Sequence, residues 1–244
     1  MLDERNGDRL ASVVPEARTM MRAWILAFTV ALFATSCGGA SFSQIAAQNS
    51  GRSIAVVSLS INDFGNSLQG WNSTATSDLM FSRATSMLQM VEGELSRDFH
   101  VIPAPEFVRE PAYQELAGAY FEVAVPRVSG EVMPVFAEGR GQLVKASIPP
   151  DRVQALAQAT RTDLIAVVYA EWGVATGSFV PTSKALSKNV VSIFDASGRR
   201  VFHGRKDVHG NKTLGALGRV VVDENSIDQW VDAFHQGITR IFGT

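Results

Sequence analysis

The sequence of 244 residues predicts an α/β fold, a single-domain sandwich in which helices pack on a mixed β-sheet and a β-hairpin comes late in the chain. Short apolar runs at residues 53–61 and 163–173 are typical of buried strands. Helical periodicity follows the first run and precedes the second. A turn with a glycine, Asp195-Ala196-Ser197-Gly198, separates two further extended stretches. Helices that alternate with strands and then give way to a strand pair favour a mixed sheet covered by helices.

The first half of the domain is predicted to contain a second strand and two helices. A polar loop at residues 63–76 precedes a stretch, residues 79–95, in which apolar residues recur near a period of 3.6, as in a long helix. Methionines within that stretch are interpreted as core filling. A short strand is expected at residues 99–102. A helix is expected over residues 106–119, with Pro111 as a kink or break.

The second half is predicted to return to the sheet. Residues 120–145 are interpreted as an extended or loop insertion. Two prolines then begin a helix that ends near Thr160. After the strand at 163–173, residues 185–195 and 199–208 form the hairpin on either side of the glycine turn.

The last predicted helix spans residues 226–242. Ser226 and Gln229 have the spacing of a capping box. Apolar residues, Trp230 among them, line one side of this helix, which we expect to dock on the sheet.

An export signal is predicted near the beginning of the chain. Arg22 precedes an uncharged, mostly apolar run at residues 23–33, which is too short to span a bilayer comfortably, since spanning needs about 20 apolar residues. Cys37, the only cysteine, ends the segment Ala34-Thr35-Ser36-Cys37, which resembles the lipobox of bacterial lipoproteins, although leucine usually stands where Ala34 does. The resemblance implies cleavage after a signal peptide of residues 21–36 and lipidation of Cys37. Ordinary signal cleavage, with Cys37 left as an incidental thiol, is the alternative.

The segments on either side of this signal are interpreted separately. Residues 1–20 mix acids and bases, unlike a net positive n-region, which indicates a mis-called upstream extension and a start at residue 20 or 21. Residues 37–52 are predicted to form a flexible tether, with a strand or short helix at 42–47 as the alternative. The α/β domain then occupies residues 53–244.

Composition limits the classes of partner. The formal net charge is −2, so charge over the whole chain predicts no electrostatic binding to nucleic acid or to an anionic membrane surface. A single cysteine allows no disulfide within the chain, so the exported domain depends on core packing. Hydrophobic residues make up 46% of the sequence, which is compatible with a sizeable core.

Three segments resemble a group of bacterial envelope lipoproteins. They are residues 54–60 (IAVVSLS), residues 153–168 (VQALAQATRTDLIAVV) and residues 190–203 (VVSIFDASGRRVFH). Together with the lipobox, their order is similar to that in the group that includes the curli-secretion lipoprotein CsgG, the penicillin-binding-protein activator LpoB and the amino-terminal domain of TolB. The resemblance implies envelope assembly, secretion or activation by protein contact, without a shared catalytic activity. The paired, alternating segments of a membrane-inserted pore are not found.

A search for catalytic and metal-binding patterns predicts no catalytic residue, no cofactor and no metal site. His203 and His209 have the same strand parity but lie about 20 Å apart along a strand. Glu92 and Glu94 are expected to be solvated, and the glycines at 139 and 141 are interpreted as a turn. Trp71, in a polar loop, is a candidate partner contact, with a tryptophan folded back onto the sheet as the alternative.

These observations predict a non-enzymatic lipoprotein, exported and anchored through Cys37 to a membrane. Gly38 after the cysteine, rather than aspartate, resembles the signal for the outer membrane, with the domain facing the periplasm. The expected partner is another envelope protein, with no nucleic acid. A periplasmic hydrolase with an unrecognised site and a subunit of a secretion channel are the alternatives. A cleft that combines His203 or His209 with a serine and a carboxylate would favour the hydrolase.

Overall fold

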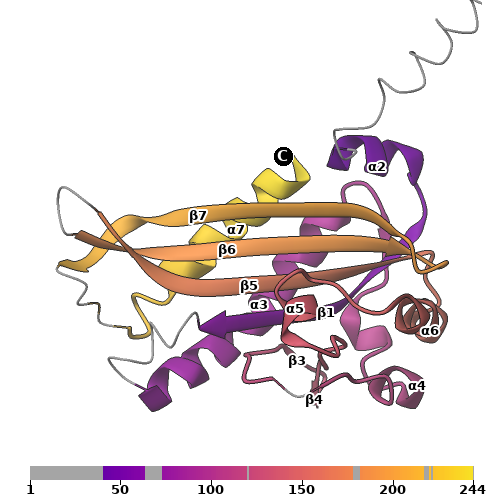
Figure 1. Ribbon diagram of the computed structural model, residues 1–244, viewed down its shortest axis with the longest axis horizontal. Coiled ribbons are helices and arrows are strands. Elements are labelled where there is room, and N and C mark those ends of the chain that lie inside the picture. Colours follow the sequence, from indigo (N-terminus) through magenta and orange to yellow (C-terminus); the bar gives the residue numbers. More distant parts are fainter. Residues whose placement is uncertain are drawn as a thin grey trace, which may run out of the picture. The chain divides into compact units, whose positions relative to one another are not determined.

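A mixed sheet organises the protein, whose computed structural model describes residues 41–63, 73–119, 121–177, 182–216, 220 and 222–243. Five strands lie in the order β2-β1-β5-β6-β7 (Figure 1). Their bounds are β1 Ser53–Asp63, β2 His100–Val101, β5 Leu164–Thr176, β6 Thr182–Asp195 and β7 Arg200–Ala216. β1 pairs parallel with β2 and β5, whereas β6 pairs antiparallel with both β5 and β7. The predicted α/β fold with a mixed sheet and a late hairpin is confirmed.

The hairpin turn has the chemistry that its sequence indicates. Gly198 has a φ of 91°, a conformation that side chains with a Cβ rarely adopt. Oδ1 of Asp195 accepts hydrogen bonds from the backbone N–H groups of Ser197 and Arg199, both at 3.1 Å. The aspartate therefore holds the turn closed while the glycine supplies its backbone shape.

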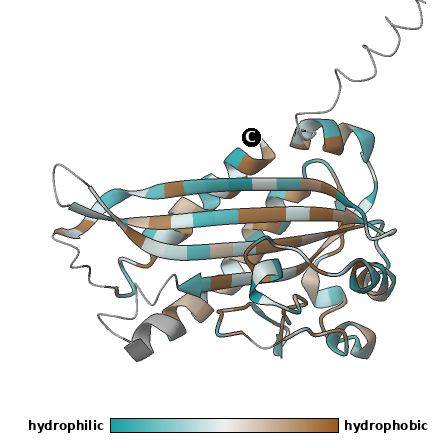
Figure 2. Ribbon diagram, in the orientation of Figure 1, coloured by the Kyte–Doolittle hydropathy of each residue, from teal (hydrophilic) through white to brown (hydrophobic). Residues whose placement is uncertain are grey.

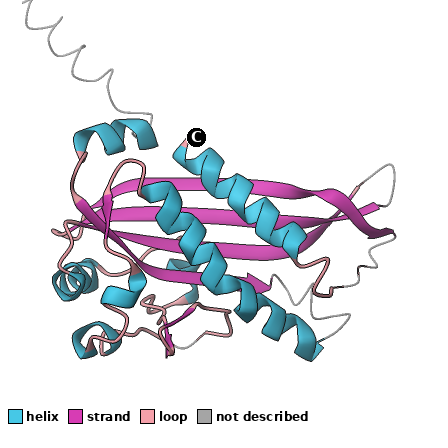
Figure 3. Cartoon of the chain, turned by 180° about the vertical axis from the view of Figure 1, so that it is seen from behind, coloured by secondary structure: helices cyan, strands magenta, loops and turns pink. Residues whose placement is uncertain are grey.

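Two helices, α3 (Ser73–Leu95) and α7 (Asp228–Phe242), cover one face of the sheet (Figure 3). The rings of Trp172 on β5 and Trp230 on α7 lie 6.5 Å apart, both fully buried. Nε1 of Trp230 donates to the carbonyl of Gly173 at 2.7 Å, so the indole is both packed and hydrogen-bonded. The predicted docking of the last helix is correct, but its capping box is wrong. The Ser226 hydroxyl accepts from the N–H of Asp223 instead, and Gln229 accepts from the N–H of Lys212.

The flexible tether predicted over residues 37–52 is wrong for residues 42–48, which form the helix α2 (Phe42–Gln48). Ser41 and Gln44 make a reciprocal capping box at its start. Phe42 packs against three aromatic rings at centroid distances of 4.5 to 6.0 Å, those of Phe99, Phe202 and Phe242. The Ser-x-x-Gln spacing before an apolar residue was the local signal for this helix.

The segment between β2 and β5 is built from short elements. They are a 3₁₀ turn Ala104–Glu106, α4 Pro111–Gln114, β3 Arg127–Val128, β4 Glu131–Val132, α5 Arg140–Leu143 and α6 Pro150–Thr160. The predicted helix over 106–119 is thus a single α-turn at Pro111–Gln114. The buried hydroxyl of Tyr113 donates at 2.6 Å to the carbonyl of Val57, which the register shift in β1 leaves outside the ladder with β5. The predicted extended or loop insertion at residues 120–145 contains the short strands β3 and β4 and, contrary to the prediction, the single-turn helix α5.

Candidate functional site

One face of the sheet is partly uncovered. The residues from 121 to 148 lie over β1 and the start of β5, whereas β6 and β7 have no helix in front of them (Figure 1). Side chains alternate between the faces of a strand, and the register places those of β5, β6 and β7 in rows across the sheet. We call this uncovered surface the open face. It consists of the exposed residues His203, Arg205, Asp207 and His209, the half-buried Glu171 and Lys188, and the buried Tyr169; the apolar Leu186 and Val190 lie on the same side of β6.

The open face is polar and internally connected. Nζ of Lys188 lies 2.8 Å from Oε1 of Glu171, and the hydroxyl of Tyr169 donates to Oε2 of the same carboxylate at 3.3 Å. Nδ2 of Asn62 on β1 donates to that hydroxyl at 3.4 Å. Burial, with a smaller contribution from the Glu171 carboxylate, raises the pKa of Tyr169 to about 12, although the Asn62 hydrogen bond opposes this rise. The tyrosine therefore stays protonated and acts as a donor.

β7 extends this polar surface toward the edge of the sheet. Arg205 donates two hydrogen bonds to the Asp207 carboxylate, at 3.1 and 3.2 Å. Both side chains remain exposed, so this surface ion pair contributes little to stability. Figure 2 shows mostly hydrophilic residues along β7, beside longer apolar stretches in β6. A rigid, solvated pattern of charges is suited to recognition of a polar surface.

Ser192 and His203 meet on this side of the sheet. The Ser192 hydroxyl lies 3.0 Å from Nδ1 of His203 and 3.3 Å from the carbonyl of Lys145. Burial, together with the nearby Arg200, lowers the pKa of His203. Ser192 is fully buried, however, so its oxygen is not open to a substrate. The pair holds the segment around Lys145 against the sheet, which is a structural role.

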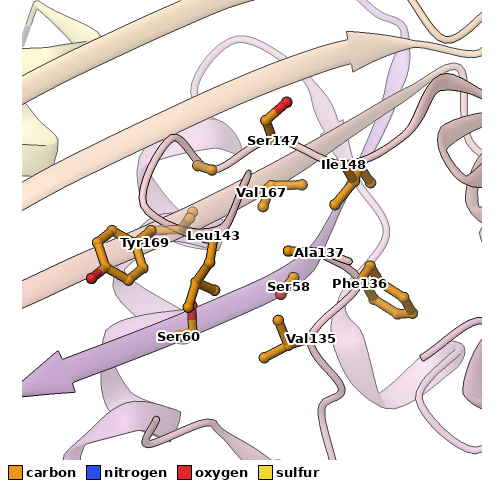
Figure 4. A pocket seen from close by; sticks show the side chains of 12 residues that line it. Ser58, Ser60, Val135, Phe136, Ala137, Leu143, Ser147, Ile148, Val167 and Tyr169 are labelled. Atoms are coloured by element: carbon orange, nitrogen blue, oxygen red, sulfur yellow. The ribbon is translucent and has the colours of Figure 1, made fainter. Parts of the chain in front are cut away.

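Two hollows lie near this pair. An internal space of about 10 Å³ is lined by Leu143, Ile148 and Val167 among others (Figure 4), and this is close to the smallest space that holds one water molecule. The second is a shallow hollow of about 550 Å³ lined by Glu138, Gln142, Lys145 and Ser147, with the glycines at 139 and 141. Gly139 precedes the single-turn helix α5 and Gly141 lies within it, so the interpretation of these glycines as a turn is wrong for Gly141.

The remaining candidate residues are distributed over the chain. Cys37 and Trp71 lie outside the described residues. The expectation that Glu92 and Glu94 are solvated is wrong. Glu92 is partly buried and accepts from the N–H of Ala104 at 2.9 Å, and burial raises its pKa. Glu94 is buried and forms an ion pair with Arg97 at 2.7 Å.

The described part of the chain also bears on metal binding and on membrane spanning. There, no three His, Cys, Asp or Glu side chains come together as metal ligands would. Among those same residues, no helix has the length and apolar character that crossing a bilayer requires.

The sequence analysis placed His203 and His209 on one side of a strand but missed the surface that they share with Arg205 and Asp207. The signal was present, because charged or polar residues occupy every second position from 203 to 209. What the sequence could not supply was the pairing register, which sets Lys188 beside Asp207 and Glu171 beside Lys188.

Comparisons with known proteins add a limited context. No family model and no curated protein matches this chain. Solved structures with some similarity include lipoprotein GNA1162 from Neisseria meningitidis, at 15% identity over 75% of this chain and 94% of that one, with a TM-score of 0.32. Another is the hypothetical protein CT253 from Chlamydia trachomatis, at 12% identity over 78% and 99% of the two chains, with a TM-score of 0.31. Likeness at this level assigns neither family nor function, so the resemblance to the group of CsgG, LpoB and TolB stays a prediction.

Proposed function

We propose that this chain is a lipoprotein of the bacterial envelope, anchored through Cys37 and without enzymatic activity of its own, which binds another envelope protein through the open face. The observation that carries the proposal is the polar surface of β5, β6 and β7, which holds the two ion pairs Lys188–Glu171 and Arg205–Asp207. The half-buried ion pair of Lys188 with Glu171, at 2.8 Å, orders these two side chains before a partner arrives, which lowers the entropy lost on binding. The lipobox sequence before Cys37 supports the anchor.

The partner contact is tested by site-specific photo-crosslinking in intact membranes. A photoreactive residue replaces His209 on the open face, and a matched control replaces Asp232, which is exposed on the outer side of α7. We expect one discrete protein adduct from position 209 and none from position 232. Equal or absent adducts at both positions would show that the open face binds no protein partner. Ring-shaped oligomers with adducts only between copies would favour the secretion-channel alternative.

The anchor is tested separately by labelling with a palmitate analogue. The wild-type chain is expected to incorporate the label and to sediment with membranes, whereas Cys37→Ala should lose the label. A labelled Cys37→Ala variant, or an unlabelled wild-type chain, would remove lipidation from the proposal without affecting the crosslinking result. Because peptide mapping of the product reads its first residue, the same sample tests the predicted cleavage before Cys37.

A further inference from the structure

The β6–β7 hairpin is strongly basic although the chain as a whole is slightly acidic. Residues 182–216 contain seven of the 22 Lys and Arg residues but only two of the 24 Asp and Glu residues. The formal charge of this hairpin is therefore +5, and that of all other residues together is −7. A count over the whole chain conceals this separation of charge.

Three of these cations lie on the edge strand without an ionic partner. β7 pairs with β6 alone and forms one edge of the sheet. Arg200, Lys206 and Lys212 are exposed on it, and none has an ion pair within the described part of the chain. The other exposed arginines of the hairpin, Arg199 and Arg205, are paired with Asp195 and Asp207. From residue 200 to residue 212 an extended strand covers about 40 Å, so the three unpaired charges are spread along the edge of the sheet.

The first described helix, α2, contacts this edge and is close in sequence to the proposed anchor. Phe42 of α2 packs on Phe202 of β7 at 5.4 Å, and α2 lies beside the β7 edge in both views of the fold (Figures 1 and 3). Ser41 is four residues after Cys37, and four extended residues reach at most about 14 Å. An acyl chain on Cys37 would therefore hold the beginning of β7 close to the bilayer surface.

We infer that the edge of β7 rests on an anionic lipid surface, with Arg200, Lys206 and Lys212 against the phospholipid headgroups. This inference rests on the proposed anchor at Cys37 for its geometry and on the unpaired cations for its chemistry. Charged residues on an edge strand also discourage pairing with a second sheet, but charges of either sign serve that purpose. An anionic bilayer would account for the excess of cations on this edge, because its surface attracts positive charge.

The test measures vesicle binding without the anchor, so that its outcome does not depend on lipidation. The chain from residue 37 to residue 244 carries Cys37→Ser, and it includes the whole compact unit Ala40–Thr244. Co-sedimentation is measured with vesicles of equal parts phosphatidylglycerol and phosphatidylcholine, and with phosphatidylcholine alone. The edge variant combines Arg200→Gln, Lys206→Gln and Lys212→Gln. A control variant of the same net charge combines glutamine substitutions of cations on β3, on α5 and after α6, namely Arg127, Arg140 and Arg161.

Each cation near an anionic bilayer changes partitioning by about five-fold, so we expect the edge variant to bind phosphatidylglycerol vesicles about 100-fold more weakly than the parent chain. The control variant should bind nearly as well as the parent, and about 0.5 M salt should abolish binding of both. Circular dichroism of each variant verifies folding. Equal losses in the two variants, or no preference for phosphatidylglycerol, would overturn the inference. Binding to a soluble polyanion such as heparin but not to the vesicles would also overturn it and would indicate an acidic macromolecule instead.

Discussion

Replacement of Gly237 by alanine is expected to destabilise the domain, because α7 meets β6 at this residue without room for a side chain. A Cβ atom on Gly237 would lie 2.0 Å from Nδ2 of Asn189 and 2.9 Å from its Cγ. Asn189 is fully buried, and its amide donates to the carbonyls of Ser187 and Lys206 at 3.4 and 3.2 Å. Its Oδ1 accepts from the Ser187 hydroxyl at 2.7 Å. The asparagine cannot move aside without breaking buried hydrogen bonds.

The expected loss follows from three contributions. Overpacking in a closed interface costs about 1–3 kcal/mol. A buried polar group left without its partner costs about 1–3 kcal/mol more. Alanine favours a helix over glycine by about 1 kcal/mol, which offsets part of both costs. We therefore expect Gly237→Ala to lower the free energy of unfolding by about 3 kcal/mol.

Urea unfolding of the chain from residue 37 to residue 244, carrying Cys37→Ser, measures this change as a shift in midpoint at constant slope. Gly93→Ala is the matched control, because Gly93 is exposed on α3 and its Cβ would meet nothing within 4 Å. This control should gain about 1 kcal/mol. Adding Asn189→Ala to Gly237→Ala should remove the clash, which gives a coupling free energy of about 2 kcal/mol between the two sites. If Gly237→Ala were as stable as the parent while Gly93→Ala gained stability, close packing of α7 on Asn189 would be refuted.

Three further predictions concern other parts of the fold. Tyr113→Phe should lower the free energy of unfolding by about 1–3 kcal/mol in urea, because it leaves the buried carbonyl of Val57 without its donor; an unchanged midpoint would contradict this. Phe42→Ala should expose α2 to limited proteolysis while the sheet persists, and resistance equal to the parent would show that the ring does not hold this helix. Burial alone would raise the pKa of Asp195, but hydrogen bonds from Ser197 and Arg199 outweigh it and hold the pKa below its ordinary value. The stability that this carboxylate contributes is therefore fully present above about pH 4 and is lost as pH falls through the lower folded pKa. Asp195→Asn should therefore reduce the loss of unfolding free energy at acid pH, measured as a curve of stability against pH. An unchanged acid side of that curve would refute the assignment.

Periodicity predicted the elements that bury a continuous apolar surface and failed where burial depends on distant partners. The strands at 53–61 and 163–173 and the last helix are long and apolar, so their patterns determine their structure. Between β2 and α6, the described part of the chain forms only elements of two to four residues. The order of this segment comes from contacts such as that of Tyr113 with β1, which no local pattern contains.

Glu92 shows why the surroundings of polar residues escaped prediction. Its position on α3, two residues from Glu94, suggested that both carboxylates face water. The loop after β2 returns over the end of this helix and presents the N–H of Ala104 to the Glu92 carboxylate. Exposure of a polar side chain depends on which segment packs over it, and that is a tertiary property. The same holds for the open face, where the odd-numbered side chains of β7 from 203 to 209 are exposed, whereas Tyr169 on β5 is buried.

The formal charge of −2 predicted no attraction to an anionic surface, yet that conclusion assumes that all charges act together. Salt screens exposed charges beyond about 10 Å, so acids on remote elements do little to cancel cations that line one edge of a sheet. Strand order therefore matters more than net charge, because it decides which residues share an edge. Under the two proposals the β6–β7 hairpin serves two partners at once. Its edge contacts lipid through Arg200, Lys206 and Lys212, and its open face, turned away from α7, stands at a right angle to the bilayer, where a partner protein can reach it.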